Sequence, residues 1–159
     1  MHARSAVLAL TLVLSSLAAV AEVHRDDRGG VTYDIPSWWK WEQREEGVVM
    51  ATEDGSLVVM VWTPKTDDLR QALQSLEKDL ERAIQQAKPD GKPTAGSLNG
   101  METLSVSGRG RVAGAPAEYS VMIVGAKRPV IVLAFAETGK YEKHTEELKG
   151  FLNTIKRIR

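Results

Sequence analysis

The chain has 159 residues and no cysteine, and its 21 lysines and arginines balance its 21 aspartates and glutamates at pH 7. Without cysteine the protein can form neither disulfides nor thiolate metal and nucleophile sites. The near-neutral balance argues against nucleic acid as a partner, because proteins that bind nucleic acid usually present a basic surface. The charges are also interspersed along the chain, so we expect no strong attraction to anionic lipid.

The first 21 residues have the pattern of a secretory signal peptide. Arg4 supplies the positive charge, and residues 6–20 carry none. Ala19 and Ala21 place small side chains at the −3 and −1 positions of a cleavage site. The apolar run is shorter than the roughly 20 residues of a membrane span, and an uncleaved anchor is the alternative. We predict cleavage near Ala21, a periplasmic or secreted location, and no membrane span after cleavage.

Cleavage leaves residues 22–159 as the mature chain, in which 20 basic residues face 21 acidic ones because only Arg4 is lost. A chain of this length is expected to form one domain and to bury a core without disulfides. Residues 22–30 are polar and predict a flexible N-terminal tail, and residues 31–159 predict the single domain.

The first half of the domain predicts three strands. Residues 31–35 alternate apolar and polar side chains, the pattern of a half-buried strand, and Pro36 ends it. A second extended run over residues 41–52 leads into an Asp-Gly pair at 54–55, a strong hairpin signal because both residues tolerate positive φ. The return strand, residues 57–62, is apolar at every position, which is typical of a strand covered on both faces.

A long amphipathic helix is predicted next, because apolar residues recur at three- and four-residue steps as far as Ala87. Thr66 can cap its first turn, and Pro89 stops it. After a loop over residues 88–100, the remaining predicted elements are strands over 101–112, 118–125 and 130–137 and a final helix from about Lys140. The apolar stripe of that helix consists of Leu148, Phe151, Leu152, Ile155 and Ile158.

The two halves therefore share one plan, three strands followed by one helix. Strands joined by tight turns are antiparallel, and strands that are apolar on both sides need a helix on each face. The sequence predicts an α+β fold: an α/β/α sandwich on a mostly antiparallel sheet of about six strands, in βββαβββα order.

Three stretches resemble the PsbP-like superfamily, which includes photosystem II extrinsic proteins and small bacterial periplasmic proteins of the DcrB kind. They are Tyr33-Asp34-Ile35-Pro36 followed by Trp38 or Trp39, SLNGMETLSVSG around Asn99-Gly100, and a last helix that ends in TIKRI. The resemblance covers most of residues 31–158 and implies the PsbP-like fold. It also implies a binding or assembly accessory without assigned chemistry, and fold by itself does not fix function.

No catalytic constellation stands out in the sequence. The nucleophile motif G-x-S-x-G is absent, and the mature chain has only His24 and His144, whereas a serine triad needs a histidine between a nucleophile and an acid. The GRGR stretch at residues 108–111 lies in a hairpin arm rather than before a helix, so it predicts no dinucleotide site. We predict that the protein is not an enzyme.

Two sets of residues could bind ions or charged partners. Arg109 and Arg111 share one strand face and could meet an anionic partner, and a solvated face is the alternative. Cleavage would also expose Glu22-Val23-His24, in which the free amine of Glu22 and the imidazole of His24 could wrap Cu(II) or Ni(II) in a square of nitrogens. An incidental histidine in a polar tail is the alternative there. No cofactor is expected.

Three of the four tryptophans, Trp38, Trp39 and Trp41, stand within four residues. In an extended segment Trp39 and Trp41 would face one way and Trp38 the other, so all three cannot be buried together. We expect Trp38 or Trp39 to plug one end of the core and another indole to lie on the surface as a contact site.

These residues predict an exported, non-enzymatic binding or assembly accessory that meets a protein partner in the periplasm or cell envelope. The alternative is a carrier of a small ligand or sugar that uses the tryptophan-rich segment. A closed apolar pocket beside Trp62 would favour the carrier.

Overall fold

The computed structural model describes residues 21–159, which form an α+β fold of two antiparallel sheets with two α-helices. The predicted α+β class is confirmed, whereas residues 1–20 of the predicted leader lie outside the described residues. Within residues 21–159, no helix combines the length and the apolarity needed to cross a bilayer. In chain order the elements are β1 (Glu22–Asp26), β2 (Val31–Ile35), β3 (Lys40–Gln43), β4 (Gly47–Ala51), β5 (Leu57–Trp62), α1 (Leu69–Ala83), β6 (Gln85–Pro89), β7 (Thr94–Leu98), β8 (Met101–Val112), β9 (Ala115–Gly125), β10 (Pro129–Glu137), the 3₁₀ turn η1 (Glu142–His144), α2 (Thr145–Leu152) and β11 (Lys156–Arg157).

The sheets are larger than predicted. Eight strands form the larger sheet in the order β3-β4-β5-β10-β9-β8-β6, with β7 also paired to β8, and β1-β2-β11 form a smaller sheet. The prediction of about six strands in βββαβββα order is therefore wrong in number and order. Five strands precede α1, five more precede α2, and β11 follows. The additional strands come from the predicted tail (β1), the predicted loop (β7) and the ends of the two predicted helices (β6 and β11). The single run predicted over residues 41–52 also folds as two strands, β3 and β4.

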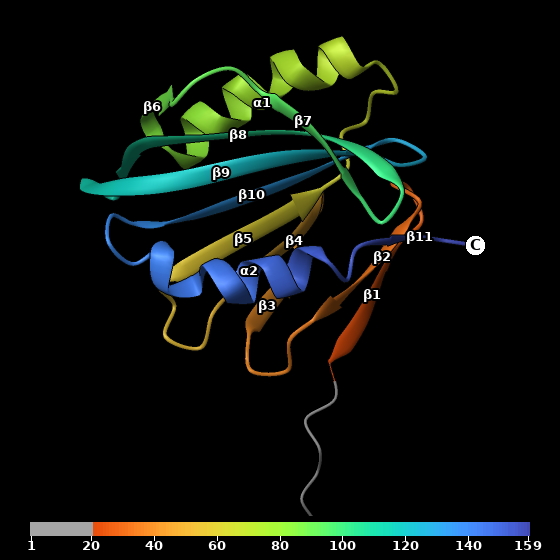
Figure 1. The fold of residues 1–159 in the computed structure, drawn as a ribbon, viewed down its shortest axis with the longest axis horizontal. Coiled ribbons are helices and arrows are strands. Elements are labelled where there is room, and N and C mark those ends of the chain that lie inside the picture. Colours follow the sequence, from red (N-terminus) through yellow and green to blue (C-terminus); the bar gives the residue numbers. More distant parts are fainter. Residues whose placement is uncertain (1–20) are drawn as a thin grey trace, which may run out of the picture.

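The two helices lie on opposite faces of the larger sheet (Figure 1). On the α2 side, the core also takes in Val31, Tyr33 and Ile35 of the smaller sheet. On the α1 side, a second core packs around Leu76 and Ile84. The strand between these two cores, β10, is buried on both faces from Val130 to Ala134, as its continuous apolar sequence predicts.

The segment predicted as a flexible tail, residues 22–30, is instead a strand and a turn. β1 pairs with β2 along its length, from Glu22 opposite Ile35 to Asp26 opposite Val31. His24 and Asp26 are half-buried, and the other side chains of β1 are exposed. A strand with one face in solvent and only a partial core contact lacks the apolar run that marks strands in a sequence.

Helix α1 ends at Ala83 rather than near Ala87. Gln86 has a positive φ of 54°, which a helix does not accommodate, and residues 85–89 pair with β8. Gly110 on β8 permits this approach, because a Cβ there would collide with the side chain of Ile84. In the sequence, the helical spacing of apolar residues continues beyond the end of α1. It does so because Ile84 and Ala87 pack against the same core as the helix, although their backbone is not helical.

The last helix is also shorter than its apolar stripe. α2 ends at Leu152, and Ile155 is fully buried beyond it. Asn99, at the turn before β8, donates through its side-chain amide to the carbonyl oxygens of Asn153 at 2.9 Å and Ile155 at 2.7 Å. These bonds satisfy carbonyls after the helix and hold its end to a segment far away in sequence.

The predicted hairpins are confirmed at β4–β5 and β8–β9. Their turns contain Gly55 with φ of 72° and Gly114 with φ of 82°, a region that glycine enters without strain.

Strand β5 is covered unequally on its two faces. Leu57, Val59 and Val61 are fully buried toward α2, as an all-apolar strand predicts. Met60 and Trp62, on the face toward α1, are only half-buried. The single helix on that side leaves part of the sheet surface uncovered at β4 and β5.

Gly47 and Gly150 provide a matched test of this packing. A Cβ on Gly47 would collide with the Val61 carbonyl oxygen and lie 2.7 Å from the Trp62 Cβ, whereas Gly150 has open space around it. We expect Gly47→Ala to destabilise the protein by about 1–3 kcal/mol. Gly150→Ala, in α2, should stabilise it by about 0.5–1 kcal/mol. Urea unfolding measures both, and an unchanged Gly47→Ala variant would contradict the packing described.

Candidate functional site

The three clustered tryptophans have different environments. The Trp39 amide donates to the Pro36 carbonyl at 2.9 Å, so the segment turns rather than running extended. The turn places Trp39 in the core at 4% exposure, while Trp38 stays 57% exposed and Trp41 38% exposed. The expected core plug is thus Trp39, and Trp38 and Trp41 are the surface indoles. The predicted pairing of Trp39 with Trp41 on one face is wrong, because it assumed extended backbone.

The carboxylate of Glu147, in the first turn of α2, accepts hydrogen bonds from the indoles of both Trp38 and Trp39. Trp39 Nε1 donates to Glu147 Oε2 at 3.0 Å, and Trp38 Nε1 donates to the same oxygen at 3.3 Å. The other oxygen lies 3.1 Å from His144 Nδ1. The Trp39 hydrogen bond, followed by those from His144 and Trp38, lowers the pKa of the Glu147 carboxyl against the opposing effect of burial. Glu147 therefore holds the exposed ring of Trp38 in a defined position.

His144 extends this network to the β4–β5 turn. Its Nε2 lies 2.5 Å from the Ser56 hydroxyl and 3.4 Å from Asp54 Oδ2. Asp54 accepts hydrogen bonds from the Thr52 hydroxyl and from the amide and hydroxyl of Ser56, and these bonds lower the pKa of its carboxyl well below the ordinary range. The turn and the start of α2 are thus joined by side chains that the sequence separates by 88 positions.

Ser56, His144 and Glu147 contact one another in the order of a serine triad, an arrangement that the sequence did not predict. Only the i, i+3 spacing of His144 and Glu147 was visible in the sequence. The Ser56 hydroxyl, however, also lies 2.8 Å from Asp54 Oδ1. A carboxylate at that place opposes the negative charge that develops on an attacked carbonyl oxygen. We therefore assign these contacts to fastening the turn onto α2.

Trp41 and His24 meet at the edge of the larger sheet. The His24 ring lies 5.0 Å from the ring of Tyr33 and 6.3 Å from that of Trp41, between centroids. His24 therefore sits in a strand rather than in the free tail that the sequence predicted. Copper or nickel binding by the amine of Glu22 with His24 stays a prediction. Among residues 21–159, no group of three or more His, Asp or Glu side chains is placed to hold a metal ion.

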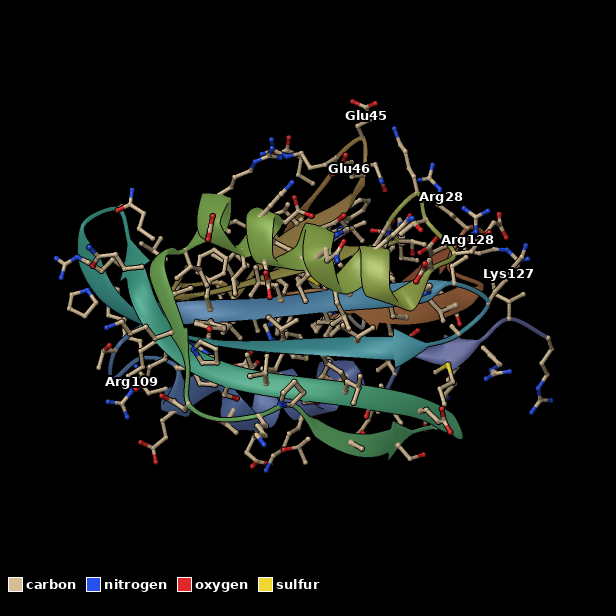
Figure 2. The ribbon with its side chains drawn as sticks, turned by 90° about the horizontal axis from the view of Figure 1, so that it is seen from above. Arg28, Glu45, Glu46, Arg109, Lys127 and Arg128 are labelled. Carbon is tan, nitrogen blue, oxygen red and sulfur yellow. The ribbon has the colours of Figure 1, made fainter. Side chains whose placement is uncertain are left out.

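Arg109 and Arg111 are not part of this region. Both are exposed on β8, and Arg111 donates to the carbonyl oxygen of Gly114 in the adjoining turn. Arg109 lies opposite Glu118 of β9 in the sheet register. Strands β8 and β3 are near opposite ends of the sheet, and Figure 2 shows Arg109 at one extreme of the molecule. The structure does not bring the two predicted binding sets together.

A groove that the sequence did not predict lies beside Trp62, between α1 and strands β4 and β5. Its floor includes the half-buried side chains of Val49, Met60 and Trp62, and its volume is about 520 Å³. A second cavity of about 410 Å³ also borders Trp62 and continues toward Lys65 and Thr66. These volumes are within the range of small-molecule sites, roughly 300–1,000 Å³. The feature is an open groove rather than the closed pocket named above.

The rim of the groove carries charges of both signs. Glu46, Asp79 and Arg82 border both cavities, and Arg82 lies 3.7 Å from Asp79. Glu45 and Glu46 project from the β3–β4 loop (Figure 2), and neither has an ion-pair partner among residues 21–159. The indole N–H of Trp62 likewise has no hydrogen-bond partner within the described chain. An apolar floor with such a rim can accept a molecule that has both apolar and polar parts.

Comparison with known proteins identifies the fold. No family model and no curated protein matches the chain. Among solved structures, the cyanobacterial PsbP protein CyanoP of Synechocystis sp. PCC 6803 is similar with a TM-score of 0.57 and 13% identity, over 90% of this chain and 95% of that one. LpqN, a Mycobacterium tuberculosis protein involved in cell envelope biogenesis, is similar with a TM-score of 0.54 and 14% identity, over 79% of this chain and 82% of that one.

A protein of Bacteroides thetaiotaomicron is similar with a TM-score of 0.57 and 12% identity over 87% of this chain, which spans 49%, about half, of that protein's length. The PsbP-like fold expected from residues 31–158 is confirmed by these similarities. At such low identities the likeness concerns the fold alone.

The Glu147 network predicts a specific acid sensitivity. Because the folded-state pKa of Glu147 is lowered from its ordinary 4.5, its contribution to stability is complete above that value and is lost as the pH falls through the folded pKa. We expect the thermal midpoint of the parent to fall between about pH 5 and pH 3, and that of Glu147→Gln to fall by less over the same range. Glu146→Gln is the control, since Glu146 is bonded only to Lys149. Equal acid sensitivity in parent and Glu147→Gln would refute the role of Glu147.

Proposed function

We propose that this protein of PsbP-like fold is an exported, non-catalytic accessory that binds a protein partner in the periplasm or cell envelope. The leader pattern of residues 1–21 supports the proposal, as does the structural likeness to CyanoP and to LpqN, a protein involved in cell envelope biogenesis. The carboxylate of Asp54 beside Ser56 and His144 also favours binding over catalysis.

The observation that carries the proposal is the tryptophan rim, defined as Trp38 and Trp41. Together with Val23, these two residues are the large apolar side chains that are exposed within residues 21–159. Large aromatic rings on a surface mark contact sites, because they bury much area and lose little conformational freedom. The bond of Trp38 to Glu147 reduces that loss further, since the ring is fixed before binding.

The rim lies at an unpaired edge of the larger sheet. β3 is the outermost strand on that side, has only four residues, and exposes all of them. Lys40 and Glu42 place charges along it, and such short, charged edges resist pairing with other strands. We therefore assign recognition to the indole rings and not to backbone pairing.

The rim can be tested by crosslinking in cells. We expect a photoreactive phenylalanine at position 38 or 41 to give one discrete adduct, and the same residue at exposed Lys92 to give none. Trp38→Ala with Trp41→Ala should weaken the identified complex at least roughly 30-fold, because the loss of even one buried aromatic anchor costs about 2 kcal/mol. The double variant must keep the parent's thermal midpoint. Undiminished affinity in a folded double variant would end this proposal.

A carrier of a small amphipathic molecule is the second candidate, and the groove beside Trp62 favours it. The groove offers half-buried Val49 and Met60, an indole N–H that has no hydrogen-bond partner among residues 21–159, and volumes of about 520 and 410 Å³. Trp62 rather than the predicted tryptophan-rich segment would contact the ligand, because Trp62 lines both cavities and none of Trp38, Trp39 and Trp41 lines either.

Filling the groove tests the carrier. We expect the parent to increase the fluorescence of anilinonaphthalene sulfonate, an apolar anion, and Val49→Phe to reduce that increase several-fold because the larger ring occupies the floor. Val58→Phe is the control, since Val58 is also a half-buried valine but does not line the groove. Equal dye binding by Val49→Phe, Val58→Phe and the parent would exclude the groove as the site.

A further inference from the structure

The β1–β2 turn joins three segments that are distant in sequence. The carbonyl oxygen of Gly29 accepts the amide of Lys127 at 3.0 Å and that of Arg128 at 3.4 Å, both from the β9–β10 turn. The carbonyl oxygen of Gly30 accepts the amide of Ile158 at 3.0 Å, from the end of the chain. One turn therefore fixes the positions of two other segments, each of which carries cationic side chains.

Both residues of this turn need to be glycine. A Cβ on Gly30 would lie 2.6 Å from the Lys127 Cβ, and Gly30 also has a positive φ of 74°. A Cβ on Gly29 would lie 2.6 Å from the Thr63 hydroxyl and 2.6 Å from a methyl group of Val130. The absence of side chains lets the three segments approach closely, so their long side chains must project outward.

The result is a concentration of positive charge that we call the basic pole. Its members come from three parts of the chain: Arg25, Arg28, Lys127, Arg128, Lys156 and Arg157. All are exposed except Arg128, which is half-buried. Figure 2 shows Arg28, Lys127 and Arg128 at the end of the molecule opposite to Arg109. The protein has no net charge, so this local excess exists only because the fold collects it.

Three acidic residues near the pole are already engaged, whereas Glu45 and Glu46 line a neighbouring cavity with Arg25 and Arg28 and have no ion-pair partner among residues 21–159. Asp27 pairs with Arg25 at 2.6 Å, and Asp67 pairs with Arg128 at 2.7 Å. Asp26 accepts from the Thr63 hydroxyl at 2.5 Å and from the Gly29 amide at 3.0 Å. Arg28, Lys127, Lys156 and Arg157 have no carboxylate within ion-pair distance in the described part of the chain. These four charges remain available to a ligand.

A cavity of about 250 Å³ opens at the centre of the basic pole. Arg25, Lys127 and Arg157 line it together with Asp27, Gly30 and Ile158, so each of the three joined segments contributes one cation. Asp27 is paired with Arg25, so Lys127 and Arg157 supply the unpaired positive charge of the cavity. Guanidinium groups present paired N–H donors that match tetrahedral oxyanions, and a lysine adds a compact charge that can reach one oxygen. We propose that the basic pole binds the phosphate group of an anionic ligand, either a phospholipid headgroup or a free phosphorylated compound.

This proposal goes beyond the accessory function and uses a separate surface. The tryptophan rim lies past the far end of β2, at the β2–β3 segment and on β3, whereas the pole begins before β2 at the β1–β2 turn. Two separate surfaces would let the protein hold an anionic surface and a partner at once. The failure of either one leaves the other unaffected, because they share no residue.

Vesicle binding tests the proposal directly. We expect the purified protein to cosediment with mixed phosphatidylglycerol–phosphatidylcholine vesicles and not with phosphatidylcholine alone, and salt should weaken the binding. Lys127→Glu with Arg157→Glu should lower the affinity roughly tenfold or more, given the attraction of each basic residue to an anionic surface. The control is Lys88→Glu with Lys92→Glu, the same charge change at exposed positions in and after β6.

A parallel titration with glycerol phosphate, followed by NMR, distinguishes the source of the phosphate. Vesicle binding that the pole variant loses and the control keeps supports a headgroup. Changes in the NMR chemical shifts of Lys127 and Arg157 on addition of glycerol phosphate, without vesicle binding, support a soluble ligand. The proposal is overturned if the parent binds neither probe, or if the pole variant, with an unchanged thermal midpoint, binds both as well as the parent. An acidic protein captured at the pole without phosphate binding would also overturn it.

Discussion

The structure depends on covering two strands, β5 and β10, that are apolar along most of their length and pair side by side in the larger sheet. Removing both faces of such strands from water is the main driving force available to a chain without disulfides. On one side, α2 and the smaller sheet provide complete cover. On the other, one helix of 15 residues, about 22 Å long, leaves β4 and β5 half-exposed. The groove beside Trp62 is the direct consequence of this unequal cover.

On the fully covered side, polar side chains close the rim of the core. Trp39 packs its ring against Phe151 at 5.6 Å between centroids and sends its N–H to Glu147, so the indole is satisfied at both its apolar and its polar end. His144, itself buried, joins the same carboxylate to the β4–β5 turn. Because Trp38 binds the same oxygen, the contact that seals the core also positions an exposed ring. The Glu147 carboxylate thus contributes both to the stability of the core and to the position of Trp38 in the proposed recognition surface.

The groove and the basic pole, which adjoin at Arg28, differ in how their charges are organised. At the groove, the rim carries both acidic and basic side chains, and Arg82 lies near Asp79. At the basic pole, the acids are paired or hydrogen-bonded and several cations are left over. A neutral protein can therefore present surfaces of different character, since the interaction between exposed charges falls off within about 10 Å at moderate salt.

The sequence by itself determined the apolar strands, the amphipathic first helix and the hairpin turn at Asp54-Gly55, because periodicity and positive φ are local properties. It also carried enough of the YDIP and Asn99-Gly100 pattern to indicate the PsbP-like fold. It could not show β1, β6 or β7, whose polar residues form strands only when a neighbour supplies the pairing.

The candidate sites were still less visible in the sequence. Trp39 and Trp38 separated into core and surface only because a turn, not a strand, follows Pro36. The charges that looked interspersed along the chain became a basic pole because two glycines bring distant segments to one point. Composition and spacing describe neighbours along the chain, whereas binding surfaces are made of neighbours in space, and only the tertiary structure decides those.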